Sequence, residues 1–246
     1  MDYSLSTKLA AEFFGTAIMV ALGNGSVATV DLEKTKGSRS GWIIISVGYG
    51  FAVMIPALMF GSISGSQINP AFTIGLATAG LFPWVEVLPY IGAQFLGAIV
   101  GQLIVVAAFK PHYDLTNNAD HILGTFSTSD ATQNYWNGFI NEFLGTFVLV
   151  FGALGITNSP DFSSGNQLSG FIGVGLLVMV IVASFGGPTG PALNPARDLG
   201  PRILHQILPL KYKGSSNWKY SWIPVTAPIF AGIIASLLYT KIFLSK

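Results

Sequence analysis

Two short runs of the sequence are near copies of each other, and each places an amide side chain at a helix start. They are Gln67-Ile68-Asn69-Pro70-Ala71 and Ala192-Leu193-Asn194-Pro195-Ala196. Asparagine is a good helix N-cap and proline is best tolerated at the first helical position, so each Asn-Pro-Ala predicts a helix start. A helix start carries about half a positive charge, and the Asn amide keeps an N–H to donate. Two starts facing one point would bind a water or hydroxyl oxygen and oppose cations.

Arg197 directly follows the second motif, whereas Phe72 stands at the corresponding place after the first. An arginine inside a membrane segment is costly, and its donors stay charged. We therefore expect Arg197 to bind hydroxyl groups and repel cations at a constriction. The structural alternative is an ion pair with Asp198 or with another carboxylate.

Two carboxylates begin the halves of the chain in similar surroundings. Glu12 lies in Ala11-Glu12-Phe13-Phe14-Gly15-Thr16 and Glu142 in Asn141-Glu142-Phe143-Leu144-Gly145-Thr146. A lone carboxylate in lipid suggests a proton relay or an ion site. Their symmetry favours another role, in which each accepts bonds from backbone N–H groups of the irregular segment of its own half, 62–68 or 186–193. Gln94 is assigned to the same structural support.

The composition places these residues in a membrane protein. The chain has 246 residues, of which 51% are hydrophobic and only 9% charged. Soluble domains carry about 25% charged residues. A helix of roughly 20 mostly apolar residues crosses a membrane. Six stretches qualify as spans, with these approximate bounds: 8–30, 41–60, 84–109, 135–157, 167–185 and 221–243.

The two stretches that begin at the Asn-Pro-Ala motifs, 69–79 and 194–206, are too short to span and are expected to be re-entrant half-helices. Each half of the chain then has three spans and one half-helix, so the second half enters from the opposite side. The predicted fold is an all-α membrane protein with an inverted repeat and a site near the midplane. We expect one domain, 1–246, with repeat 1 over about 1–109, a linking loop over 110–134 and repeat 2 over 135–246.

Several functions are disfavoured by what the sequence contains. A net charge of +1 suggests no nucleic-acid partner, and the absence of cysteine excludes disulfides and Cys-bound metal. The histidines of the linking loop, His112 and His121, show no metal-ligand spacing, so a solvated loop is expected and no metal or cofactor is proposed. No nucleophile–base pair points to an enzyme. Aromatic residues near the predicted span ends indicate an interfacial belt: Trp42, Trp84, Trp136, Trp218, Tyr220 and Trp222.

Together these motifs resemble those of the major intrinsic protein family, the aquaporins and aquaglyceroporins, along essentially the whole chain. The resemblance is carried by the twin Asn-Pro-Ala motifs, Arg197, the two Glu repeats, and Ser64-Gly65. It implies a right-handed helical bundle, a homotetramer with one pore per subunit, and cytoplasmic termini. The distribution of Lys and Arg would place the termini outside; we follow the resemblance, because long loops and sparse charge weaken that count. The short termini favour a prokaryotic plasma membrane.

Within the family, Asp198 and Arg202 resemble the glycerol-facilitator branch. Four family filter positions fall, by spacing from the motifs, on Tyr49, Val182, Pro191 and Arg197. They match neither the water-selective nor the glycerol pattern beyond the aromatic residue and the arginine. The absence of histidine among them argues against a water-only pore. Tyr49, Val182 and Pro191 form an apolar wall opposite one donor cluster, which suits a solute with hydroxyls on one edge.

The expected function is therefore a passive channel for glycerol, water and other small uncharged solutes that excludes protons and ions. The alternative is a channel mainly for water or for another neutral solute: undissociated lactic acid, dihydroxyacetone, urea or hydrogen peroxide. A proton-coupled secondary transporter, which would need Glu12 or Glu142 on the pathway, is the less favoured class.

Overall fold

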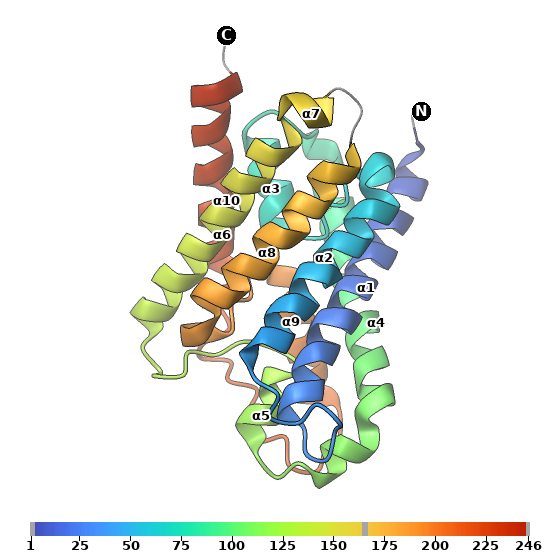
Figure 1. The fold of residues 1–246 in the computed structure, drawn as a ribbon, viewed down its shortest axis with the longest axis vertical. Coiled ribbons are helices and arrows are strands. Elements are labelled where there is room, and N and C mark those ends of the chain that lie inside the picture. The colour runs from blue at the N-terminus through green and yellow to red at the C-terminus, as the bar shows by residue number, and fades with distance from the viewer. Residues whose placement is uncertain (1–2, 164–166, 245–246) are drawn as a thin grey trace.

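The computed structural model describes residues 3–163 and 167–244 of the chain. Six helices in these ranges are long and apolar enough to cross a membrane (Figure 1). They are α1 (Leu5–Asp31), α2 (Trp42–Ser64), α4 (Trp84–Leu115), α6 (Tyr135–Thr157), α8 (Gln167–Thr189) and α10 (Ile223–Tyr239), which continues as a π-helical turn, Thr240–Leu244. The predicted all-α fold with six spans is confirmed.

Two half-helices, α3 (Pro70–Thr78) and α9 (Pro195–Ile207), start at the prolines of the Asn-Pro-Ala motifs. Two further short helices are α5 (Ala119–Gly124) and α7 (Pro160–Ser163). The first span begins and the last helical turn ends at the same end of the bundle (Figure 1). The outermost residues of the predicted domain, 1–2 and 245–246, lie outside the described residues.

The third predicted span was placed too short at its C-terminal end. It was expected to stop at 109, but α4 continues through Pro111 to Leu115. The apolar stretch does end near Lys110, yet the Lys110 ammonium lies 2.5 Å from the Asp114 carboxylate one turn on, an i,i+4 pair that favours helix. A helix can continue past the end of its apolar stretch, and composition locates only the end of the apolar stretch.

Each half-helix packs against a span of the opposite repeat. Helix α3 contacts α10, and α9 contacts α4, while α2 and α8 meet along the boundary between the repeats. The half-helices therefore stand inside the bundle, with their N-termini directed toward each other.

Glycines allow these close approaches. A Cβ added at Gly232 of α10 would lie 2.4 Å from the Ala71 carbonyl oxygen of α3, and one at Gly101 of α4 would lie 2.4 Å from the Ala17 carbonyl oxygen of α1. In lipid, where little hydrophobic force drives helices together, small residues give the contact that holds a bundle. The glycine-rich composition therefore serves packing between backbones.

Replacing Gly101 by alanine should destabilise the bundle, because the added methyl group would clash with the Ala17 carbonyl oxygen, a backbone atom that cannot move away as a side chain could. We expect Gly101→Ala to lower the free energy of unfolding by about 1–3 kcal/mol. Gly92 lies on the same helix with no atom within 4 Å of an added Cβ. Gly92→Ala should be neutral or stabilise by up to about 1 kcal/mol, since alanine favours helix. Thermal unfolding in detergent would measure both, and equal midpoints would contradict the packing argument.

Candidate pore and filter

The two capping asparagines meet at the centre of the bundle and bind across the repeat boundary. The Asn69 side-chain oxygen accepts from the Ala71 N–H at 2.9 Å, and that of Asn194 accepts from the Ala196 N–H at 3.0 Å. The Asn69 amide nitrogen donates to the Leu193 carbonyl at 2.8 Å, and the Asn194 amide nitrogen donates to the Ile68 carbonyl at 2.7 Å. An amide has two N–H donors, so each asparagine keeps one. Both side chains line the same cavity.

The residue before each asparagine has a left-handed backbone. Ile68 has φ 43° and Leu193 has φ 55°. For a β-branched residue such as Ile68 this conformation is an outlier, and it costs about 1–3 kcal/mol. The gain is that each carbonyl reaches the asparagine of the other repeat. The cost must be offset by bonds nearby.

Glu12 and Glu142 supply those bonds. Both are fully buried. Glu12 accepts from the Gln67 and Ile68 N–H groups at 2.9 and 2.7 Å, from the Ser64 hydroxyl at 2.7 Å and from the Gln94 amide at 2.8 Å. Glu142 accepts from the Ala192 and Leu193 N–H groups at 2.8 and 2.9 Å, and from the Thr189 hydroxyl at 3.1 Å. Each carboxylate thus binds backbone N–H groups just before the asparagine of its own half. The irregular segments are shorter than the predicted 62–68 and 186–193, because α2 continues to Ser64 and α8 to Thr189.

The four residues assigned to the filter come together around one cavity of about 180 Å³. Its lining includes Tyr49 from α2, Val182 from α8, and Pro191 and Arg197 from either side of the second asparagine. Arg197 is only 3% exposed. Its guanidinium donates from Nη1 to the Phe126 carbonyl at 3.2 Å and from Nη2 to the Tyr49 hydroxyl oxygen, and its Nε has no partner among the described residues.

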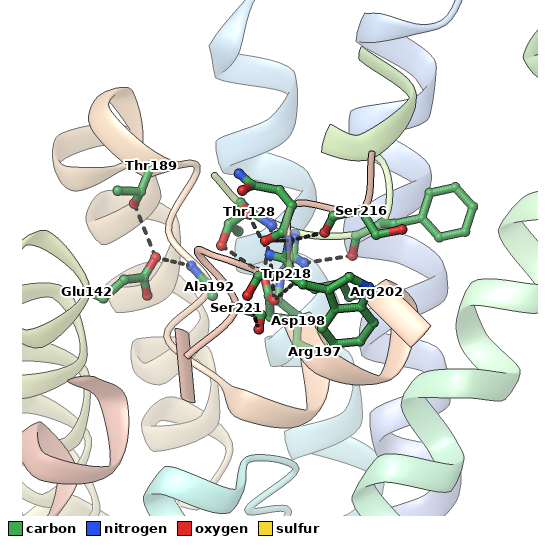
Figure 2. A network of polar contacts seen from close by, with 12 residues as sticks. Thr128, Glu142, Thr189, Ala192, Arg197, Asp198, Arg202, Ser216, Trp218 and Ser221 are labelled. Atoms are coloured by element: carbon green, nitrogen blue, oxygen red, sulfur yellow. Dashed lines mark hydrogen bonds and ion pairs between the residues drawn. The ribbon is translucent and has the colours of Figure 1, made fainter. Parts of the chain in front are cut away.

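The carboxylate next to Arg197 is engaged elsewhere. Asp198 pairs with Arg202, one turn on, at 2.8 Å, and both side chains are fully buried. Asp198 accepts from the Thr128 N–H at 2.7 Å, while Arg202 donates to the Thr128 and Ser216 carbonyls, each at 2.7 Å (Figure 2). This ion pair binds α9 to two connecting segments, one carrying Thr128 and the other Ser216. One of them carries the Phe126 carbonyl that Arg197 contacts.

A second cavity, of about 310 Å³, lies along the other half of the bundle. Asn69 and Asn194 line it together with apolar side chains from α2, α6 and α8. Phe72, which stands where the second repeat has Arg197, is also in its wall. The two cavities therefore differ: an arginine lines one, and an aromatic ring stands at the equivalent position in the other.

Sequence reasoning misjudged the linking segment, Tyr220 and Trp42, and it missed Asn24. The linking segment is not simply solvated, because Phe126 is fully buried and Ser127 is 1% exposed. Tyr220 was assigned to an interfacial belt but is fully buried. Trp42, assigned to the same belt, donates from its indole to the Val182 carbonyl at 2.9 Å. Asn24, for which no role was predicted, accepts from the Tyr49 hydroxyl. The sequence pattern of a polar loop, or of an aromatic residue at a helix end, is the same whether the segment faces solvent or the site.

Six membrane-spanning helices, two half-helices whose capped starts meet inside, and an arginine beside one of those starts define the class of channel-like membrane proteins. The model of the family described as "Major intrinsic protein" matches residues 2–239, and the chain belongs to that family. The family is one of channels and facilitators, which agrees with the expectation of a non-enzyme.

Relatives and a solved structure resemble the chain over nearly its whole length. The "Glycerol uptake facilitator protein-like 5" of Lactiplantibacillus plantarum is 51% identical, with 99% of each chain covered. The "Glycerol facilitator-aquaporin gla" of Lactococcus lactis subsp. cremoris is 46% identical, covering 99% of this chain and 100% of the relative. The X-ray structure of the aquaglyceroporin from Plasmodium falciparum superposes with a TM-score of 0.87 at 30% identity, with 97% of each chain covered.

Glu12→Gln tests the support of the first irregular segment. A glutamine has one oxygen where the carboxylate has two, and its NH2 group would face N–H donors. We expect the free energy of unfolding to fall by about 2–4 kcal/mol. Glu86→Gln is the matched control, because among the described residues the Glu86 carboxylate pairs with the partly exposed Lys8 at 3.3 Å, a contact of about 0–1 kcal/mol. Detergent unfolding curves compare them, and a Glu12→Gln variant as stable as wild type would refute the role.

Proposed function

We propose that the protein is a passive transmembrane channel for glycerol, water and other small uncharged solutes, and that it excludes protons and ions. The observation that carries the proposal is the arrangement of donors along the two cavities. The Arg197 guanidinium, which gives only two of its five N–H groups to protein acceptors, lines one cavity, and each asparagine keeps one N–H at the other; these groups offer donors to a passing oxygen. Tyr49, Val182 and Pro191 offer apolar surface around the Arg197 cavity.

Exclusion of protons follows from the asparagine pair. A water between Asn69 and Asn194 meets two N–H donors and the positive ends of two half-helices. Its oxygen accepts from both, so its own hydrogens point away from the pair and the hydrogen-bonded chain of waters is interrupted there. Hydronium and metal cations meet the same positive potential and that of Arg197.

Glycerol is favoured as solute because the filter pairs a donor with apolar walls, and because the relatives at 51% and 46% identity bear glycerol-facilitator names. In the usual glycerol pattern of the family, a glycine and a phenylalanine stand where this chain has Val182 and Pro191. The alternative is therefore a channel mainly for water or for undissociated lactic acid, dihydroxyacetone, urea or hydrogen peroxide. A proton-coupled transporter is disfavoured, since Glu12 and Glu142 bind backbone N–H groups and neither lines the described cavities.

The proposed setting is a homotetramer in a prokaryotic plasma membrane, with both termini cytoplasmic. Large apolar side chains lie on the outside of the bundle, such as Val85 at 81% and Leu88 at 78% exposure on α4. In a membrane these faces meet lipid or a neighbouring subunit. The bacterial origin of the relatives agrees with the setting.

Stopped-flow light scattering on proteoliposomes tests the proposed function. Under a glycerol gradient, vesicles with the protein should reswell faster than empty vesicles, whereas under a sucrose gradient they should only shrink. Uptake should not saturate at low concentration and should not respond to a proton gradient. Glycerol permeability equal to that of empty vesicles would exclude glycerol as a solute, and dependence on a proton gradient would favour the transporter.

Val182→Gly tests whether this side chain narrows the filter. Removing a side chain from the wall of a cavity of about 180 Å³ should raise glycerol flux several-fold relative to wild type. Val180→Gly is the matched control, because it introduces the same glycine into α8 at a position that is 52% exposed. Both variants carry the helix cost of glycine, about 1 kcal/mol. Equal glycerol flux in the two variants would remove Val182 from the filter.

A further inference from the structure

A chain of buried polar groups leads from the filter arginine back into α1 and α4. Arg197 donates from Nη2 to the Tyr49 hydroxyl oxygen, and the Tyr49 hydroxyl donates to the Asn24 side-chain oxygen. The Asn24 amide nitrogen donates to the Gln102 side-chain oxygen at 2.5 Å and to the Phe126 carbonyl at 3.3 Å. Asn24 and Gln102 are fully buried, and neither lines the described cavities. We call Asn24, Tyr49 and Arg197 the filter relay.

The direction of each bond in the filter relay is fixed by chemistry. A guanidinium has donors only, so the Tyr49 oxygen must accept from Arg197 and its proton must go elsewhere. The Asn24 side-chain oxygen accepts that hydrogen bond. The Asn24 amide cannot be reversed, because its NH2 group faces the Phe126 carbonyl, which can only accept. The buried amide therefore determines which way the Tyr49 hydroxyl points.

The relay also allots the donors of Arg197. Nη2 gives one N–H group to Tyr49 and Nη1 gives one to the Phe126 carbonyl, so three of the five N–H groups of the guanidinium, that of Nε among them, have no protein partner among the described residues. The Arg197 Cζ lies 5.0 Å from the centroid of the Tyr49 ring, so the guanidinium and the ring hold each other in place. Tyr49 offers solutes its ring, while its hydroxyl stays engaged with protein.

We propose that Asn24 is a positioning residue for solute selection. By accepting a hydrogen bond from the Tyr49 hydroxyl, Asn24 leaves the Tyr49 oxygen free to accept from Arg197, and this holds the guanidinium in one position at the wall of the filter cavity. The proposal rests on the proposed channel function. It adds a residue outside the pore wall that determines how well the filter distinguishes glycerol from water.

Glycerol depends on this orientation more than water does. A glycerol molecule must bring an oxygen to the donor while its carbons lie against the apolar wall, so a displaced donor loses one contact or the other. Water has no carbon edge and accepts from a donor in many directions. Loss of the relay should therefore lower glycerol permeability while leaving water permeability little changed.

The test is a double-mutant cycle of Tyr49→Phe and Asn24→Leu in proteoliposomes, with glycerol and water permeability measured by stopped flow. Each single variant should lower the glycerol-to-water ratio about five-fold, the factor for one net hydrogen bond. The double variant should fall no further, because both changes break the same chain. The matched controls are Tyr239→Phe, at the far end of α10, and Asn158→Leu, at the end of α6. Tyr239 packs against Phe151 and Phe243, and the Asn158 amide donates to the Leu154 carbonyl at 2.8 Å. These contacts lie outside the relay, so both variants should keep the wild-type ratio.

Independent effects would multiply to about a 25-fold fall in the double variant, and that result would overturn the relay. An unchanged ratio in Asn24→Leu would overturn it equally. If Asn24→Leu does not fold, Asn24→Leu with Gln102→Met removes both partners of the buried bond, and the same ratios decide. Wild-type vesicles without glycerol flux would overturn the proposed function, whereas wild-type flux with independent or absent variant effects would overturn the relay alone.

Discussion

The structure depends on one constraint: backbone that is not helical must be satisfied inside a membrane. The half-helices create two such segments, one before each central asparagine, and each would leave N–H groups without partners in hydrocarbon. A buried carboxylate meets the need, because it offers two oxygens and binds N–H groups strongly. Glu12 and Glu142 each take two successive N–H groups from the left-handed turn. Those turns orient the Ile68 and Leu193 carbonyls, each of which accepts from the asparagine of the other repeat. The position of the two asparagines therefore depends on the bonds to the carboxylates.

The two repeats share this support but differ four residues after the asparagine. In the first repeat that position is Thr73, which accepts from the neutral Gln94 at 3.0 Å. In the second it is Asp198, whose charge requires Arg202 and two donors from Thr128. The neutral Thr73–Gln94 bond joins α3 only to α4 of its own half, although α3 also packs against α10 of the other half. The Asp198–Arg202 pair binds the connecting segments that carry Thr128 and Ser216 to α9. The first of these segments also carries the Phe126 carbonyl, which accepts from Arg197. A symmetric scaffold thus carries an asymmetric filter.

The sequence predicted what depends on local pattern. The spans follow from apolar length, the half-helices from Asn-Pro starts, and the carboxylate contacts from the need of irregular backbone for acceptors. It could not predict Phe126 or Trp42, because each contributes through a contact between distant segments: a carbonyl to Arg197, and an indole to the Val182 carbonyl. A carbonyl has no side-chain signature. Asn24 carried a signal, as a buried amide in an apolar span, but its partners come from α2 and α4 and no spacing links them.

The same contacts explain how a charge can remain unneutralised at this depth. A buried arginine usually pairs with a carboxylate, and Asp198 is adjacent in the chain. Asp198 is instead bound to Arg202 and Thr128, while Arg197 donates to a carbonyl and a hydroxyl. Neutral acceptors bind Nη1 and Nη2 of Arg197 without cancelling its charge. Its positive potential then adds to that of the two half-helix starts, and a cation meets it in a region of low dielectric where charge repulsion is strong. An Arg197–Asp198 pair would have cancelled this potential, so the engagement of Asp198 elsewhere keeps an unpaired positive charge at the wall of the cavity.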